Sequence, residues 1–213
     1  MQKLILLIML IIPAIGNATA PTLFDQSLKK YQKSKMVSMN VEKIVVSEIL
    51  AKETTYSGQI KLSSGKFRWE NEKPEKTLLL FDGKNLFSVQ YPSKEFNTGT
   101  QVAKSKIDEK GKKQILIASL LSPNSAKSKF KLLSEKKGPV LTEVEIQPDS
   151  PDLQIKNLTL SIHQKTKQIQ NISYKDDVGN LTKMSFSNIK FDTKADPKLF
   201  QYKIPKDAQV TNL

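Results

Sequence analysis

The residue types that do chemistry in enzymes and metal sites are scarce in this sequence. His163 is the one imidazole in the chain, and there is no cysteine. A zinc site needs several imidazole or thiolate ligands, and a catalytic triad needs a base beside a nucleophile. His163 stands between Ile162 and Gln164 on a predicted strand, where we expect an ordinary edge or surface histidine. We therefore predict no metal site, no cofactor and no imidazole-based catalysis.

Two adjacent carboxylates, Asp176 and Asp177, are a second candidate, because paired acids hydrolyse glycosidic bonds. They directly precede the Val178-Gly179 turn, where aspartate side chains commonly bond to the turn's backbone. We therefore expect a structural role for them. The remaining turn glycines stand singly, without the spacing of a loop that cradles phosphate: Gly83, Gly111 and Gly138. These features argue against an enzyme.

The charge of the chain is strongly positive, at +13. Residues 100–138 hold ten lysines and three acidic residues, a local excess of +7, and Arg68 is the single arginine of the chain. Because base readout in nucleic acids relies on the planar arginine fork, we predict no nucleic-acid partner. Two interpretations of the basic region stay open: a solvated face, or a docking face for an acidic partner or an anionic membrane surface.

The first residues are typical of a secretory signal peptide. Lys3 supplies a positive start, residues 4–12 are apolar, and small residues follow at Gly16, Ala18 and Ala20. The apolar run is shorter than the roughly 20 residues that span a bilayer. We therefore expect residues 1–20 to be a signal peptide, cleaved after Ala18 or after Ala20, and the mature protein to be soluble and periplasmic.

Residues 21–213 contain no linker and no internal repeat, so we expect a single domain. An amphipathic helix opens it. Thr22 and Asp25 have the spacing of a capping box, and apolar residues recur near one helical face at Leu23, Phe24, Leu28 and Tyr31.

The pattern then changes to short strands. Phe67 and Trp69 share one side of a strand, and Arg68 faces the other way. Residues 78–81 form a near-continuous apolar run, as in a strand buried on both faces. Asp82-Gly83 after this run predicts a type I′ hairpin turn.

The second half of the chain continues with strands. The Val178-Gly179-Asn180 segment predicts a turn, and the parity of apolar positions slips between Phe186 and Ile189, which predicts a bulge. We expect a last short strand over residues 200–202. Between the two halves, residues 111–123 favour a short apolar helix that ends before Pro123.

The whole pattern comprises about ten or eleven short strands at regular spacing, with two helices. Such a sheet is antiparallel and strongly curved, and it suits a closed small barrel or a half-barrel. Because helices need their apolar faces buried, we favour a mainly β (α+β) fold. We expect an unclosed, strongly curved antiparallel β half-barrel with helices covering its mouth.

Two blocks of sequence carry a family resemblance. Residues 65–92 hold an F-x-W pair, a following proline, an apolar strand, a D-G turn and an aromatic strand. Residues 176–210 hold D-x-x-G-N-x-T followed by F-x-Y-x-x-P. With the apolar helix between them, this order resembles the LolA family of periplasmic outer-membrane lipoprotein carriers. The resemblance covers essentially the whole mature chain.

The resemblance implies a half-barrel with helices across its mouth that carries lipoprotein acyl chains. Such carriers receive lipoproteins from an inner-membrane ABC exporter and deliver them to an outer-membrane receptor. Family members typically carry Arg-Pro before the F-x-W pair, and that arginine holds the helical lid shut. Residues 62–64 are Leu-Ser-Ser here, and Arg68 is expected on the wrong side of its strand. What latches the lid therefore stays open.

We accordingly expect a non-catalytic, monomeric periplasmic carrier whose partners are acylated lipoproteins, the exporter and, where the organism has one, the receptor. Two alternatives remain: an envelope regulatory or other lipid-binding module on the same fold, and a basic polyanion-binding protein. The expected acyl-binding cavity is lined by apolar side chains from strands and from the second helix: Phe67, Trp69, Leu80, Phe87, Val89, Ile115, Leu116, Leu120, Leu121, Leu160, Ile162, Met184 and Phe186.

Overall fold

The computed structural model describes residues 20–92, 99–107, 120–121, 130–149 and 155–213. These ranges form a 12-stranded sheet, an α-helix and a short 3-10 helix. The elements follow in chain order: α1 (Leu23–Lys33), β1 (Met36–Ser47), β2 (Lys52–Ser63), β3 (Lys66–Lys73), β4 (Thr77–Phe81), β5 (Asn85–Gln90), β6 (Gln101–Lys106), β7 (Phe130–Lys137), β8 (Leu141–Pro148), β9 (Ile155–His163), β10 (Ile169–Asp176), β11 (Leu181–Asp192), η3 (Pro197–Phe200) and β12 (Gln209–Asn212).

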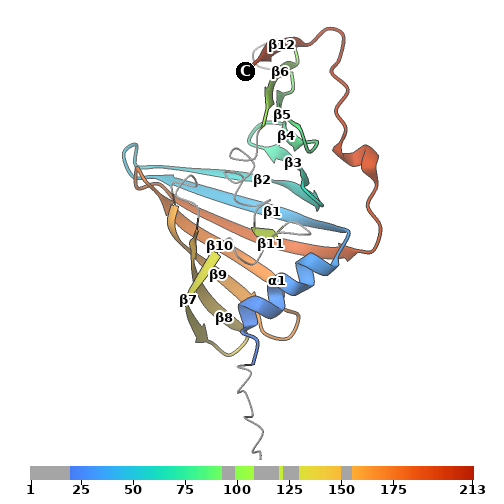
Figure 1. Ribbon diagram of the computed structural model, residues 1–213. Helices are drawn as coiled ribbons and strands as arrows, with labels where there is room; N and C mark the ends of the chain where they lie inside the picture. The colour runs from blue at the N-terminus through green and yellow to red at the C-terminus, as the bar shows by residue number, and fades with distance from the viewer. Residues whose placement is uncertain (1–19, 93–98, 108–119, 122–129, 150–154) are drawn as a thin grey trace, which may run out of the picture.

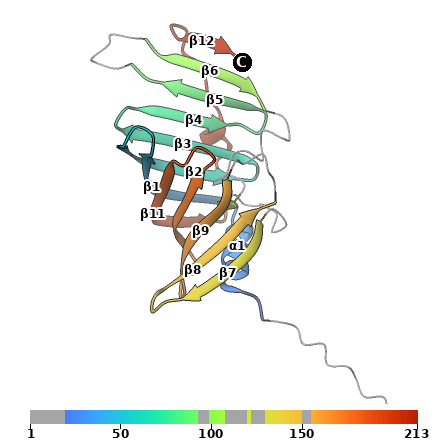
Figure 2. The ribbon, with the colours of Figure 1, turned by 90° about the vertical axis from the view of Figure 1, so that its left-hand side faces the viewer.

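The sheet is open and strongly curved, as Figures 1 and 2 show. Its strand order is β12-β6-β5-β4-β3-β2-β1-β11-β10-β9-β8-β7, so β1 lies in the middle and the end strands β12 and β7 do not pair with each other. Successive neighbours are antiparallel, except that β12 runs parallel to β6. The predicted mainly β, unclosed antiparallel sheet is confirmed, with 12 strands where we expected ten or eleven.

Helix α1 lies on the hollow side of the sheet (Figure 1). The predicted capping box is present: the Thr22 hydroxyl accepts from the Asp25 amide, and the Asp25 carboxylate accepts from the Thr22 amide. The helix buries Phe24, Leu28 and Tyr31. The second predicted helix, over residues 111–123, lies largely outside the described residues, so helical cover of the mouth is observed only in part.

The hairpin between β4 and β5 differs by one position from the prediction. Phe81 pairs with Leu86, and the Asp82 amide donates to the Asn85 carbonyl, so the loop residues are Gly83 and Lys84 rather than Asp82 and Gly83. Gly83 has a φ of 103° and Lys84 is not in the positive-φ region, so the turn is not type I′. The Asp82 carboxylate instead accepts from the amides of Lys84 and Asn85.

The predicted bulge in the last long strand is confirmed. Ser38 pairs with Lys190 and Asn40 pairs with Ser187, so two residues of β11 oppose Met39 alone. Asn188, one of those two, has a φ of 51°. Because a bulge bends its strand and increases its twist, it contributes to the curvature of the sheet.

Strands β2 and β3 approach each other closely at Gly58. A Cβ atom at this position would collide with the backbone carbonyl of Glu70. The pairing register shifts at the same place, between Ser57 and Gly58. Because glycine has no side chain, Gly58 permits this close approach of β2 and β3 at the point where their pairing register shifts.

The C-terminal region departs from the prediction of a strand over residues 200–202, which is wrong. Asp196 caps η3, with Pro197 in its first turn, and Phe200 is the last residue of this 3-10 helix. The chain then runs across the sheet face opposite to α1 and ends as β12 beside β6 (Figure 1). A proline at a helix start, after an aspartate cap, favours a helical turn over an extended strand.

Candidate functional site

The sheet carries an apolar cluster on each face. The inner cluster is the buried apolar set on the hollow side, contributed by α1, β1–β4, β7–β11 and residues 120–121. The outer cluster lies on the opposite face of β4, β5 and β6, beneath the C-terminal segment. Its buried members and the residues packed against them are few: Leu78, Leu80, Phe87, Val89 and Val102, with Tyr91, Tyr202, Ile204 and Ala208.

The pairing register decides which cluster each side chain joins. Residues paired directly across an antiparallel ladder point to the same face. Phe67 pairs with Phe81, and both belong to the inner cluster. Arg68 pairs with Leu80, and Leu80 pairs with Phe87, so these three point to the outer face.

The structure therefore divides the predicted lining residues between the two faces. Leu80, Phe87 and Val89 belong to the outer cluster, so the prediction that they share one surface with Phe67 and Trp69 is wrong. Leu80 lies in a run of four apolar residues, 78–81, which has no alternation, so the sequence does not show which face of the sheet Leu80 takes. Trp69 packs against the inner cluster, whose other predicted members are buried in it: Phe67, Leu120, Leu121, Leu160, Ile162, Met184 and Phe186. Ile115 and Leu116 lie outside the described residues.

The inner cluster has two covers in the described part of the chain. One is α1; the other is the pair Leu120 and Leu121, which are helical and have no exposed surface. Whether the residues beneath them bind acyl chains stays a prediction.

Helix α1 is fastened to the sheet at both ends. The Phe24 amide donates to the Glu135 carboxylate of β7 at 2.9 Å, which also places a negative charge at the helix N-terminus. Lys30 donates to the Thr166 carbonyl at 2.8 Å, and the Ile169 amide donates to the Tyr31 hydroxyl at 3.3 Å. Burial raises the pKa of Tyr31, so this hydroxyl stays neutral. These contacts hold α1 in place over the inner cluster.

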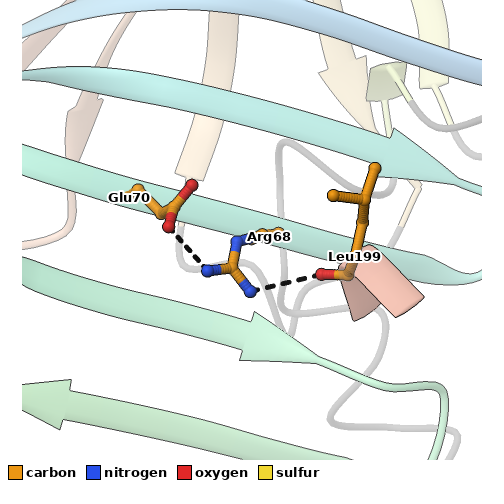
Figure 3. Close-up of polar contacts among 3 residues, drawn as sticks. All are labelled: Arg68, Glu70 and Leu199. Carbon is orange, nitrogen blue, oxygen red and sulfur yellow. Dashed lines mark hydrogen bonds and ion pairs between the residues drawn. The ribbon is translucent and has the colours of Figure 1, made fainter. Parts of the chain in front are cut away.

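Arg68 belongs to the outer face, as the sequence predicted. Figure 3 shows its guanidinium between the Glu70 carboxylate, at 2.6 Å, and the Leu199 carbonyl of η3, at 3.3 Å. The hydrogen bond from Arg68 lowers the pKa of Glu70. Arg68 therefore fastens the C-terminal segment to β3, on the face opposite to the inner cluster.

The inner face also holds polar residues that the sequence analysis missed. Lys43 of β1 and Tyr56 of β2 are direct partners, and Lys43 also pairs with Met184 of the inner cluster. Their place follows from the alternation Val37, Met39, Val41 along β1, which continues to residue 43. That alternation was the available signal.

The remaining candidates for chemistry have structural roles. The Nδ1 atom of His163 accepts from the amides of Lys165 and Thr166, both at 3.2 Å. The Asp176 carboxylate accepts from the amides of Val178 and Asn180, as expected for a turn. Within the described ranges, no three histidine or acidic side chains gather as metal ligands, and no helix has the length and apolarity to cross a membrane.

Comparison with known proteins identifies the family. The model of the family described as outer membrane lipoprotein carrier protein LolA matches residues 24–203. The chain belongs to the LolA family. An outer-membrane lipoprotein carrier protein of Cupriavidus pinatubonensis is 29% identical over 161 residues, which is 73% of this chain and 70% of that protein. The family is one of carrier proteins rather than enzymes.

Solved structures similar to this chain were also found. An uncharacterized conserved protein from Thermus thermophilus has a TM-score of 0.53 at 15% identity, covering 89% of this chain and 97% of that one. A LolA superfamily protein from Nitrosomonas europaea has a TM-score of 0.45 at 10% identity, covering 83% and 96%. The first of these similarities concerns the fold alone.

Proposed function

We propose that this protein is a periplasmic carrier that shields the acyl chains of lipoproteins against the inner cluster and ferries them to the outer membrane. The observation that carries the proposal is the large buried apolar cluster on the hollow side of an unclosed sheet, in a chain of the LolA family. The role needs no catalytic group.

The physical requirement matches this arrangement. Each methylene moved from water into an apolar environment gains about 0.8 kcal/mol, so a triacylated protein does not leave a membrane unaided. A carrier must replace that environment and still release its cargo. An unclosed sheet can receive chains without breaking strand pairs, because its edge strands β7 and β12 are not joined.

In our proposal, the acyl chains take the place that Leu120 and Leu121 occupy over the inner cluster. Helix α1 is fastened by Glu135, Thr166 and Ile169, so its removal would break several polar contacts. Leu120 and Leu121 have no exposed surface, so their displacement would expose the apolar residues beneath them.

The finer features of the role belong to the same proposal. Residues 1–20 direct export and are removed, and residues 21–213 act as one monomeric domain in the periplasm. The cargo comes from an inner-membrane ABC exporter and passes to an outer-membrane receptor where one exists. The protein does not act as an enzyme.

A release assay tests this function. Proteoliposomes containing the exporter and a triacylated lipoprotein of the same organism are given ATP and residues 21–213, then sedimented. We expect lipoprotein in the supernatant in a complex with the carrier. A lipoprotein variant that lacks its acylated cysteine is the control and should not bind. Retention of all lipoprotein in the pellet, with ATP hydrolysed, would refute the proposal.

A further inference from the structure

Lys43 is a cation on the inner face of the sheet, beside the buried apolar residues. Lys43 follows Val37, Met39 and Val41 on the same side of β1, and its direct partner on β11 is the buried Met184. The neighbouring lysine on β11, Lys183, is exposed and pairs with Ile44, so it points to the opposite face. Lys43 is therefore directed toward the hollow by the strand register.

The Lys43 ammonium is surrounded by aromatic rings. Its Nζ atom lies 5.5 Å from the ring centroid of Tyr56 and 5.5 Å from that of Trp69. Among the described residues it has no ion pair with an aspartate or glutamate. Burial lowers the pKa of Lys43. A half-buried cation without a counter-ion is an electrostatically incomplete site.

The same indole ring offers a second donor. The Nε1 atom of Trp69 is buried and has no hydrogen-bond partner among the described residues. Buried polar groups almost always find a partner, so an orphaned donor points to a ligand or a water. Trp69 packs against the inner cluster and the Lys43 ammonium lies over its ring, so the two side chains are neighbours beside the same apolar cluster.

We propose that Lys43 and the Trp69 indole N–H bind the negatively charged headgroup of a lipid whose acyl chain lies along the inner cluster. The headgroup is a carboxylate or a phosphate, since both are anionic oxygen acceptors for these donors. This site rests on the proposed function for its acyl-binding surface. It adds a ligand class, anionic single lipids, that acyl shielding by itself does not require.

Other polar residues near Lys43 on the inner face support a headgroup site there. Tyr174 and Thr182 lie on the same face, as direct partners across β10 and β11, and Thr182 pairs with Val45, two residues beyond Lys43. The inner face is thus apolar beside α1 and becomes more polar toward the β1–β2 turn. An amphipathic ligand oriented with its chain toward α1 would match that gradient.

The test compares three lipids with the same chain: palmitate, hexadecyl phosphate and hexadecanol. Binding to residues 21–213 is measured by titration calorimetry below the concentration at which the lipids aggregate. We expect at least one anionic lipid to bind about tenfold more tightly than hexadecanol. The anion with the larger preference identifies the headgroup as carboxylate or phosphate.

Three variants assign the preference to the site. K43M should remove it and leave hexadecanol binding intact, which also shows that the variant is folded. K43R should keep it, because the charge remains. K183M removes an exposed lysine from the opposite face and should leave the preference unchanged, which excludes a general effect of net charge.

The outcomes distinguish failure of the headgroup site from failure of the proposed carrier function. Equal binding of all three lipids to the unchanged protein, or a preference that survives in K43M, would overturn the headgroup site and leave acyl shielding in place. Absence of binding by all three lipids would overturn acyl shielding, and the headgroup site with it.

Discussion

The two faces of one sheet carry apolar clusters that are covered in different ways. The outer cluster is confined to β4, β5 and β6 and lies beneath Tyr202, Ile204 and Ala208 of the C-terminal segment. That segment is fastened by Arg68 to Leu199 and continues into β12. The inner cluster extends from β1 to β4 and from β7 to β11, beneath α1 and residues 120–121.

In our proposal, this difference separates an apolar cluster that only stabilises the fold from one that also binds a ligand. The small outer cluster is covered by a segment that pairs with the sheet, so its burial stabilises the fold. The inner cluster is far larger and includes the fixed α1 as well as Leu120 and Leu121. In our account only the inner surface exchanges a protein cover for acyl chains.

A matched pair of phenylalanines gives the largest expected effect. Phe186 in the inner cluster and Phe87 in the outer cluster are each 6% exposed and lie on strands. Replacement of either by alanine should lower the free energy of unfolding by about 3–5 kcal/mol, measured by urea denaturation. The affinity of the folded protein for an acyl probe should fall only in F186A. Equal loss of affinity in both variants would contradict the proposal that only the inner face binds acyl chains.

A pair of tyrosines gives a smaller effect. In Y31F the buried Ile169 amide loses its acceptor, so the free energy of unfolding should fall by about 1–3 kcal/mol. The Tyr202 hydroxyl, at the outer cluster, is buried without a hydrogen-bond partner in the part of the chain that the structure describes, so Y202F should be neutral or slightly stabilising. Thermal denaturation of both variants checks this contrast. A larger loss of stability in Y202F than in Y31F would contradict the conclusion that the Tyr31 hydroxyl helps to hold α1 on the sheet.

The smallest expected effect concerns the ion pair of the C-terminal segment. The pKa of Glu70 is lowered from 4.5 by its bond to Arg68, so its contribution is present above that pH and is lost as the pH falls through the folded-state value. Because the pair is partly exposed, E70Q should cost about 0.5 kcal/mol at neutral pH. In urea denaturation, the difference in the free energy of unfolding between E70Q and the unchanged protein should be smaller in acid than at neutral pH. A constant difference at every pH would show that the ion pair does not account for it.

Much of the fold was predictable because it depends on local patterns. The capping box at Thr22 and Asp25, the turn at Asp176 and the bulge after Phe186 each follow from a few neighbouring residues, and each is confirmed. Residues 200–202 were wrongly predicted as a strand. Tyr202 packs against the outer cluster, a long-range contact that no local pattern records.

The candidate site was predictable only where the sequence alternates. Phe67 and Trp69 alternate with Arg68, and their common face is confirmed. Leu80 lies in an unbroken apolar run, so nothing local indicated which face it takes. The alternation of Val37, Met39 and Val41 indicates the face of Lys43, but only the register places it opposite Tyr56.

Contact quenching of Trp69 tests the central claim most directly. Trp69 is the one tryptophan of the chain and borders the inner cluster. A fatty acid brominated along its chain quenches indole only on contact, so binding to the inner face should quench Trp69 fluorescence. A W69F/Y202W variant moves the reporter to the outer cluster; it lacks the indole donor of the headgroup site, but its inner cluster should still bind the acyl chain, without quenching. Saturable binding of the brominated chain that quenches the outer reporter and leaves Trp69 unaffected would contradict the account.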